Sequence, residues 1–258
     1  MSYIGTNIES LAWKVEGSID RFFRNNEPRL DIVGTSSVSA LAAILSLHKI
    51  RWSARPHLVI VASLEEATAL ETSLSFFEPQ KNVHILPAFD VGIYSGLYPN
   101  RKVITQRLAW LWHASRAKPG EVFIAPIDAL LQKTVPYPVL HQSSFSLNKN
   151  EPIPDRLNER LQNIGYTSVP IVEDVGTFAL RGGILDIYSP SQSKPTRFEL
   201  FGDIVDSIRS FDPETQRSGD GHARIDVIPA QELIFSDEHR ARAAGMLQSS
   251  LDGRDSDR

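Results

Sequence analysis

Cysteine is absent from this 258-residue chain, and its absence excludes disulfide scaffolds and cysteine-ligated zinc ribbons. The sequence also lacks an apolar run of the ~18–20 residues that a membrane span needs. Its first residues, Met1 to Asn25, lack the basic start and unbroken apolar run of a signal peptide. We therefore expect a cytoplasmic protein with no membrane partner. At 41% hydrophobic and 22% charged residues, the chain is long enough for one large or two ordinary globular domains.

Neither sign of charge dominates, because 27 Lys and Arg stand against 31 Asp and Glu, a net charge of −4. Residues 1–140 hold 14 basic and 12 acidic side chains, whereas residues 141–258 hold 13 basic and 19 acidic ones. Affinity for duplex DNA rests mainly on neutralised phosphates. The acidic second part therefore argues against DNA binding there.

Strand and helix patterns alternate over the first 135 residues. Four apolar runs are typical of strands: 30–33, 57–62, 83–86 and 122–125. The run 57–62 has the near-continuous apolar character of a strand covered on both faces. Helical spacing is seen at 8–23, 38–48, 64–77 and 104–115, with Ser63 as N-cap of the third. The alternation predicts βαβ units with a mostly parallel sheet, an α/β domain over residues 1–136.

The pattern changes after Pro136. Residues 143–147 alternate as in a strand with one wet face, and residues 155–164 form a short helical pattern. Strand patterns then follow at close intervals: 169–172, 177–181, 183–188, 197–201, 204–211 and 225–228. Turn residues separate them, among them Gly182-Gly183 and Gly202-Asp203. The pattern predicts a small α+β domain with an antiparallel sheet over residues 137–230.

The segment from Gly34 to Leu41 lies where a phosphate-binding loop would lie, between a strand and a helix. Such a loop needs Gly, Lys and Ser or Thr at its sixth, seventh and eighth positions, which here hold Ser39, Ala40 and Leu41. The groups that approach the phosphates and bind magnesium are missing. We therefore expect a degenerate nucleotide loop, an inert structural turn, and no cofactor.

No other catalytic or metal-binding constellation is found. The acidic pair Asp237-Glu238 resembles a helicase acidic box, but Ser236 before it is typical of an N-cap and favours a solvated helix start. The seven histidines show no metal-ligand spacing, and no Gly-x-Ser-x-Gly motif supports a nucleophile. We expect neither a metal site nor a catalytic residue.

Arg181-Gly182-Gly183 predicts a tight hairpin that leads into a half-buried strand. Arg181 then lies at the rim of a small sheet. Arg197 and Glu199 lie two residues apart on the adjacent strand and so point to the same side. Arginine is favoured at protein interfaces because of its rigid fork and weak hydration. An interface role and a purely structural hairpin are both compatible with these residues.

Three motifs resemble one family: Arg181 to Tyr188, Arg197 to Asp203 and Val205 to Arg217. They look like the second domain of the bacterial transcription-repair coupling factors, the Mfd family, and of its relative, the excision-repair helicase UvrB. Upstream segments that match the same pattern are 86–94, Pro99, 103–108 and 122–133. The resemblance covers roughly residues 30 to 235.

Three features of this chain distinguish it from UvrB or from a whole coupling factor. UvrB keeps its phosphate-binding loop, whereas the coupling factors resemble this chain in having lost it. The segment 94–107 is short and lacks the tyrosine-rich hairpin with which UvrB clamps DNA. The length of 258 residues is too short for the motor of a whole coupling factor. The resemblance therefore implies the N-terminal UvrB-homology module, with a degenerate helicase-like (RecA type) first domain and residues 231–258 beginning a partly disordered return segment to it.

The resemblance implies a non-catalytic module that docks onto UvrA, the damage-sensing ATPase of nucleotide excision repair. Arg181, Arg197 and Glu199 match charged residues of that docking surface by position, and Gly182 and Tyr188 of the same motif are further candidates for partner binding. Where the family often has another arginine, this chain has Thr167 and Ser168. Other implied partners are the rest of the coupling factor and, through it, RNA polymerase. The alternatives are a fragment of a UvrB-like ATP-dependent helicase and a module that binds DNA directly.

Overall fold

A computed structural model describes residues 38–39, 41–42, 55–77, 79, 82–92, 94–234, 241–242 and 244–249 of the chain. Contacts divide the chain into two compact units, Met1–Ala88 with Arg116–Gln132, and Phe89–Ser115 with Lys133–Arg258. The first unit therefore ends at Gln132, and residues 89–115 group with the second unit.

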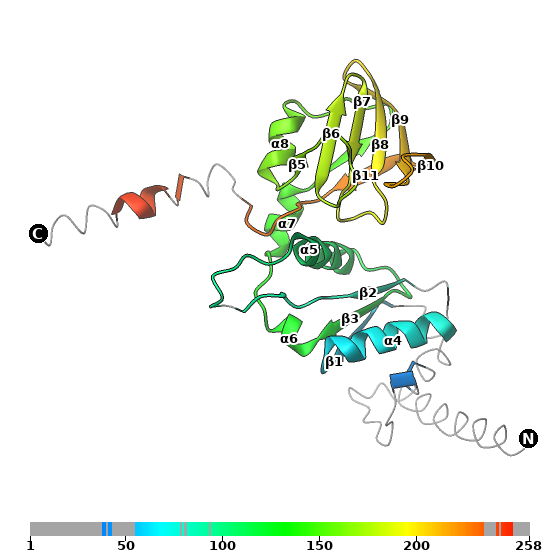
Figure 1. Cartoon of the computed structure of the whole chain (residues 1–258), viewed down its shortest axis with the longest axis vertical. Coiled ribbons are helices and arrows are strands. Elements are labelled where there is room, and N and C mark those ends of the chain that lie inside the picture. Colours follow the sequence, from blue (N-terminus) through cyan, green and yellow to red (C-terminus); the bar gives the residue numbers. More distant parts are fainter. Residues whose placement is uncertain are drawn as a thin grey trace, which may run out of the picture. The chain divides into compact units, whose positions relative to one another are not determined.

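The first unit contains a three-stranded parallel sheet in the order β1-β3-β2 (Figure 1). Its strands are β1 (His57–Val61), β2 (Val83–Ile85) and β3 (Val122–Pro126). Helix α4 (Leu64–Phe77) packs its buried residues Leu70 and Leu74 against this sheet, and the one-turn helix α6 (Ile127–Leu130) follows β3. These elements confirm the predicted α/β class.

Helix α4 begins where the sequence predicts because its first turn is capped. The backbone N–H of Glu66 donates to Ser63 Oγ at 3.2 Å, and the Glu66 carboxylate accepts from the N–H of Ala62 at 3.0 Å. This reciprocal arrangement resembles a capping box, which satisfies N–H groups that lack helical partners.

Strand β1 differs from its prediction. Val59 and Val61 pack into the core with α4, but Leu58 and Ile60 are 56% and 57% exposed. The prediction of a strand covered on both faces is therefore wrong for β1, which is at the end of the described strand order. The central strand β3 is buried at all of its 5 residues and is the one that fits that prediction.

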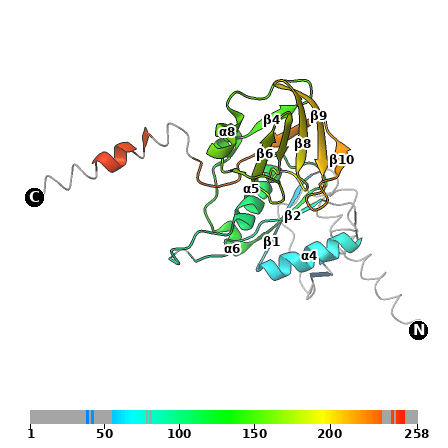
Figure 2. The ribbon, with the colours of Figure 1, turned by 45° about the horizontal axis from the view of Figure 1, so that its top comes forward.

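The second unit is built around a six-stranded sheet in the order β10-β9-β8-β7-β6-β5 (Figure 1, Figure 2). The strands are β5 (Thr167–Ser168), β6 (Thr177–Arg181), β7 (Ile184–Ile187), β8 (Thr196–Phe201), β9 (Ile204–Phe211) and β10 (Ser218–Gly221). Neighbours pair antiparallel except for β5 and β6, which are parallel. This sheet confirms the predicted antiparallel α+β part.

Two-residue turns connect the central strands of this sheet. Arg181 pairs with Ile184 around Gly182-Gly183, and Phe201 pairs with Ile204 around Gly202-Asp203. Gly182 has φ +57° and Gly202 has φ +62°, values that glycine adopts without the steric cost of a Cβ. The turns predicted from these residues are confirmed.

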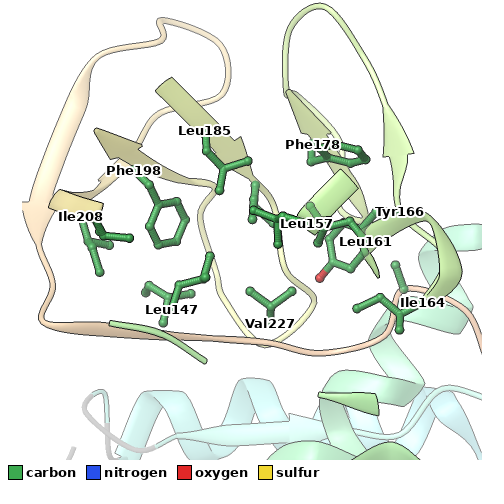
Figure 3. Packing of buried hydrophobic residues seen from close by; sticks show 14 residues of the cluster. Leu147, Leu157, Leu161, Ile164, Tyr166, Phe178, Leu185, Phe198, Ile208 and Val227 are labelled. Carbon is green, nitrogen blue, oxygen red and sulfur yellow. The ribbon is translucent and has the colours of Figure 1, made fainter. Parts of the chain in front are cut away.

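One face of the six-stranded sheet packs against α8 (Leu157–Asn163) and the two-stranded sheet of β4 (Phe145–Asn148) and β11 (Arg224–Val227). Figure 3 shows this core, in which side chains from the sheet meet side chains from the covering elements. The labelled core residues are Leu147, Leu157, Leu161, Ile164, Tyr166, Phe178, Leu185, Phe198, Ile208 and Val227. The opposite face of the sheet, called the outer face below, points away from this core.

A second cluster of the same unit joins α5 (Arg101–Ser115) to α7 (Tyr137–Ser143). Its buried members are Ile104, Leu108, Trp112, Val135, Leu140 and Ile228. The predicted apolar stripe of α5 is therefore a packing face. None of the helices in the described part of the chain is long and apolar enough to cross a membrane.

Several elements differ from the predictions. The strand expected at 169–172 is displaced to Thr167–Ser168, and Val172 is buried in a small cluster with Ala179 and Phe211. Helices α6 and α7 and strand β10 were not expected. β10 consists of Ser-Gly-Asp-Gly, which has low strand propensity, and forms because it pairs with β9. The elements predicted at 8–33 and the Ser236 cap lie outside the described residues.

Candidate protein-interaction site on the outer face

The outer face of the six-stranded sheet gathers most of the residues predicted to bind a partner. Residues two apart on a strand point to the same side, and the register pairs Asp186 with Arg197 and Arg197 with Arg209. Phe198 and Leu185, on the opposite side of the same strands, are fully buried. The outer face therefore carries these side chains: Arg181, Ile184, Asp186, Tyr188, Arg197, Glu199, Ser207 and Arg209.

Arg181 ends β6 at the rim of this face, beside the exposed Gly182-Gly183 turn. Its side chain is 53% exposed, and its Nη2 lies 3.3 Å from Oδ2 of Asp186. A half-exposed guanidinium with one anchored nitrogen leaves most of its five N–H donors for a partner. The structure thus places Arg181 where the sequence predicted it.

Glu199 is exposed and lies opposite Ile184 on β7 and Ser207 on β9. The hydroxyl of Ser207 donates to Glu199 Oε2 at 2.7 Å. This bond uses one lone pair of the carboxylate and leaves the others toward solvent. Glu199 therefore presents an oriented negative charge on the same face as Arg181.

Arg197 differs from Arg181 because it is mostly covered. Its side chain is 21% exposed, and its Nε and Nη2 donate to the Asp186 carboxylate at 2.7 and 2.9 Å. Its guanidinium carbon lies 4.6 Å from the ring centre of Phe211. The hydrogen bond to Asp186 raises the pKa of Arg197, so the guanidinium stays protonated within this ion pair.

Tyr188 lies at the apolar end of the outer face, against the cluster of Val172, Ala179 and Phe211. Its hydroxyl donates to the backbone carbonyl of Ser193 at 3.0 Å, and burial raises its pKa. Its hydroxyl proton is therefore engaged within the chain, and the exposed part of the ring is what a partner can contact.

Exposed apolar side chains lie close to these charges. Ile184 is exposed between Arg181 and Glu199 in the register, and Phe201 ends β8 two residues after Glu199 at 84% exposure. An exposed aromatic side chain beside arginines is a common composition of protein interfaces. The sequence reasoning did not single out Phe201.

The nucleotide-loop residues are described only in part. Ser39 and Leu41 lie in a helical segment, where Ser39 Oγ lies 3.2 Å from Ser73 Oγ of α4 and Leu41 packs against the core of the first unit. Gly34 and Ala40 lie outside the described residues. The two described positions thus contact the scaffold.

Within the described ranges, no three His, Cys, Asp or Glu side chains come together as a metal site.

Sequence reasoning also missed Asp186, which lies under both arginines. The signal for it was a single acidic residue inside the apolar strand Ile184–Ile187.

Comparison with known proteins places this face within a named domain. The family model of the UvrB interaction domain matches residues 146–233, which include the whole six-stranded sheet. Over 228 residues, the chain is 36% identical to the transcription-repair-coupling factor of Myxococcus xanthus, covering 85% of this chain and 19% of that protein. The factor of Haemophilus influenzae is 32% identical and that of Staphylococcus aureus (strain USA300) is 33% identical, each over 70% of this chain.

The chain therefore carries a UvrB interaction domain. It belongs to the family of transcription-repair-coupling factors, as the resemblance predicted. It spans less than a fifth of the length of these relatives, since the matches cover 19%, 16% and 15% of them.

Proposed function

We propose that this chain is a non-catalytic protein-interaction module that recruits UvrA to a transcription-repair coupling factor at stalled RNA polymerase. The outer face of the six-stranded sheet is the docking surface in this proposal. Arg181 and Glu199 are its charged contacts, Gly182 keeps the hairpin tip clear of side chains, and Arg197 and Tyr188 support the face.

The observation that carries the proposal is the position of Arg181 and Glu199. Both are exposed, both are held on one side by a neighbour, and both lie within the residues matched by the UvrB interaction domain. The net negative charge of residues 141–258 also favours a protein partner over a phosphate backbone.

The non-catalytic part of the proposal rests on the degenerate loop. Ala40 stands where a nucleotide-binding lysine is needed, and Ser39 and Leu41 replace the glycine and the magnesium-binding hydroxyl. The first domain, residues 1–136, then serves as a scaffold and residues 137–230 as the docking domain. Excision repair acts on cellular DNA, so the proposal implies a cytoplasmic location.

The test is a calorimetric titration of the chain with purified UvrA. Arg181→Ala removes the guanidinium fork without removing a core group, and we expect a loss of about 1–2 kcal/mol of binding free energy. Arg156→Ala is the matched control, because Arg156 is also an exposed arginine in an ion pair but precedes α8 on the core side of the sheet.

Unchanged affinity of the Arg181→Ala variant would contradict the assignment of the docking face. A wild-type chain that does not bind UvrA would contradict the function itself. A salt-sensitive gel shift with duplex DNA at moderate protein concentration would favour the direct DNA-binding alternative.

A further inference from the structure

Asp186 is a carboxylate with no exposed surface in the middle of the outer face. Both of its oxygens accept hydrogen bonds from arginines. Oδ1 accepts from Arg197 Nε at 2.7 Å, and Oδ2 accepts from Arg197 Nη2 at 2.9 Å and from Arg181 Nη2 at 3.3 Å. A buried carboxylate is costly unless it is paired and hydrogen-bonded, so the two arginines are part of the reason it is tolerated.

Arg197 uses most of its donors inside the chain. Besides the two bonds to Asp186, its Nη2 donates to Gln216 Oε1 at 3.2 Å and its Nη1 reaches the Gln216 carbonyl at 3.5 Å. These contacts engage four of the five N–H groups of a guanidinium. Gln216 is itself fixed, because its Nε2 donates to the carbonyls of Val172 and Pro213 at 3.3 and 2.8 Å.

Arg181 shares the same carboxylate but is otherwise oriented toward solvent. Its one hydrogen bond in the described contacts is the 3.3 Å bond to Asp186 Oδ2, and half of its side chain is exposed. The two arginines therefore have different environments, although the sequence pattern treats them alike. Arg197 is fixed by hydrogen bonds within the chain, whereas Arg181 is anchored through one nitrogen and its other N–H donors remain available to a partner.

We propose that Asp186 is a positioning residue for partner binding, and that Arg197 acts through it by holding the carboxylate that orients Arg181. This inference rests on the proposed function, since it concerns the same docking face. Anchoring one nitrogen of Arg181 removes rotamer freedom before binding, and a side chain that is already ordered loses less entropy on association. The open side of the planar fork fits a carboxylate of the partner protein.

The experiment measures the affinity of UvrA for the 258-residue wild type and three variants: Arg181→Ala, Asp186→Asn and the double variant. We expect about a tenfold loss for Arg181→Ala, a loss of the same order for Asp186→Asn, and a double variant no weaker than Arg181→Ala alone. Such non-additivity shows that Asp186 acts through Arg181. A purely structural role would lower thermal stability and leave the affinity of the folded protein unchanged.

A second variant keeps the test valid if Asp186→Asn folds poorly because the charge of Arg197 loses its partner. Asp186→Leu combined with Arg197→Met replaces the ion pair by apolar groups of similar size, a change that buried pairs often tolerate. We expect it to fold by circular dichroism and to bind UvrA about tenfold more weakly than wild type.

The outcomes separate the two claims. If the wild-type chain binds UvrA and the folded Asp186 variants bind it with the same affinity, the positioning role is overturned and the proposed function still stands. Additive losses in the double variant would overturn it as well. Absence of wild-type binding to UvrA would overturn the proposed function and the positioning role together.

Discussion

Arg107 has no exposed side-chain surface, and its Nε lies 3.3 Å from Oε1 of Glu232, a residue 125 positions further along the chain. The guanidinium also lies 4.1 Å from the ring centre of Phe89 and reaches the carbonyl of Lys133 at 3.4 Å. Burial raises the pKa of Glu232, and the charge of Arg107 opposes that shift. The pair thus fastens α5 to the chain segment that follows β11.

Breaking this buried pair is expected to be strongly destabilising. Arg107→Ala leaves a cavity beside Phe89 and an unpaired Glu232, and we expect a loss of about 3–5 kcal/mol in the free energy of unfolding. Urea denaturation followed by circular dichroism measures it. Arg224→Ala is the control, because Arg224 pairs with Asp226 at 2.9 Å but is 60% exposed, so we expect a change below about 1 kcal/mol. Equal losses in the two variants would contradict the burial argument.

We expect the buried Tyr166 to make the protein less stable at alkaline pH. Its hydroxyl is buried and donates to the carbonyl of Ile228 at 2.7 Å, and burial raises its pKa well above the ordinary 10.0. The unfolded chain releases this proton from about pH 10, whereas the folded chain retains it. The contribution of Tyr166 to the free energy of unfolding is therefore complete below pH 10. Above pH 10 this contribution falls by about 1.4 kcal/mol per pH unit.

Urea titrations between pH 8 and pH 11 test this dependence. Tyr166→Phe is expected to have a shallower alkaline slope and to lose about 1 kcal/mol at neutral pH, since the Ile228 carbonyl loses its donor. Tyr94→Phe, at a fully solvated position, serves as the control. A Tyr166→Phe variant with the wild-type alkaline slope would disprove the assignment.

The Gly182-Gly183 turn predicts unequal effects of alanine at its two positions. A Cβ on Gly182 meets open space, and its strain comes from φ +57° alone, about 1–2 kcal/mol. A Cβ on Gly183 would lie 2.9 Å from the carbonyl oxygen of Leu200, so the β7–β8 pairing must shift. We expect Gly183→Ala to lower the melting temperature more than Gly182→Ala. The reverse order would show that the turn conformation differs from the one described.

Nucleotide binding is expected to be absent. Without lysine at position 40, the loop lacks the side chain that holds the β- and γ-phosphates. Isothermal calorimetry with ATP and magnesium should therefore show no micromolar binding, and an ATPase assay should show no turnover by the chain. Micromolar ATP binding would instead favour the alternative of a UvrB-like ATPase fragment.

The sequence alone predicted those elements whose causes are local. Helix Leu64–Phe77 follows from apolar spacing and the Ser63 cap, and strands Thr177–Arg181 and Ile204–Phe211 follow from alternation bounded by turn residues. The exposed position of Arg181 also follows locally, because the glycine turn beside it ends the strand. Apolar periodicity, caps and turns act over a few residues, so they can be read without knowing the fold.

Only the tertiary structure decided which charges are buried and which are presented. Arg181 and Arg197 are equivalent in the sequence pattern, but the register of β6, β7 and β8 places Asp186 between them and Gln216 beside Arg197. Arg107 is likewise unremarkable on its helix until Glu232 and Phe89 meet it in space. The surroundings of a charge depend on residues distant along the chain, and folding alone brings them together.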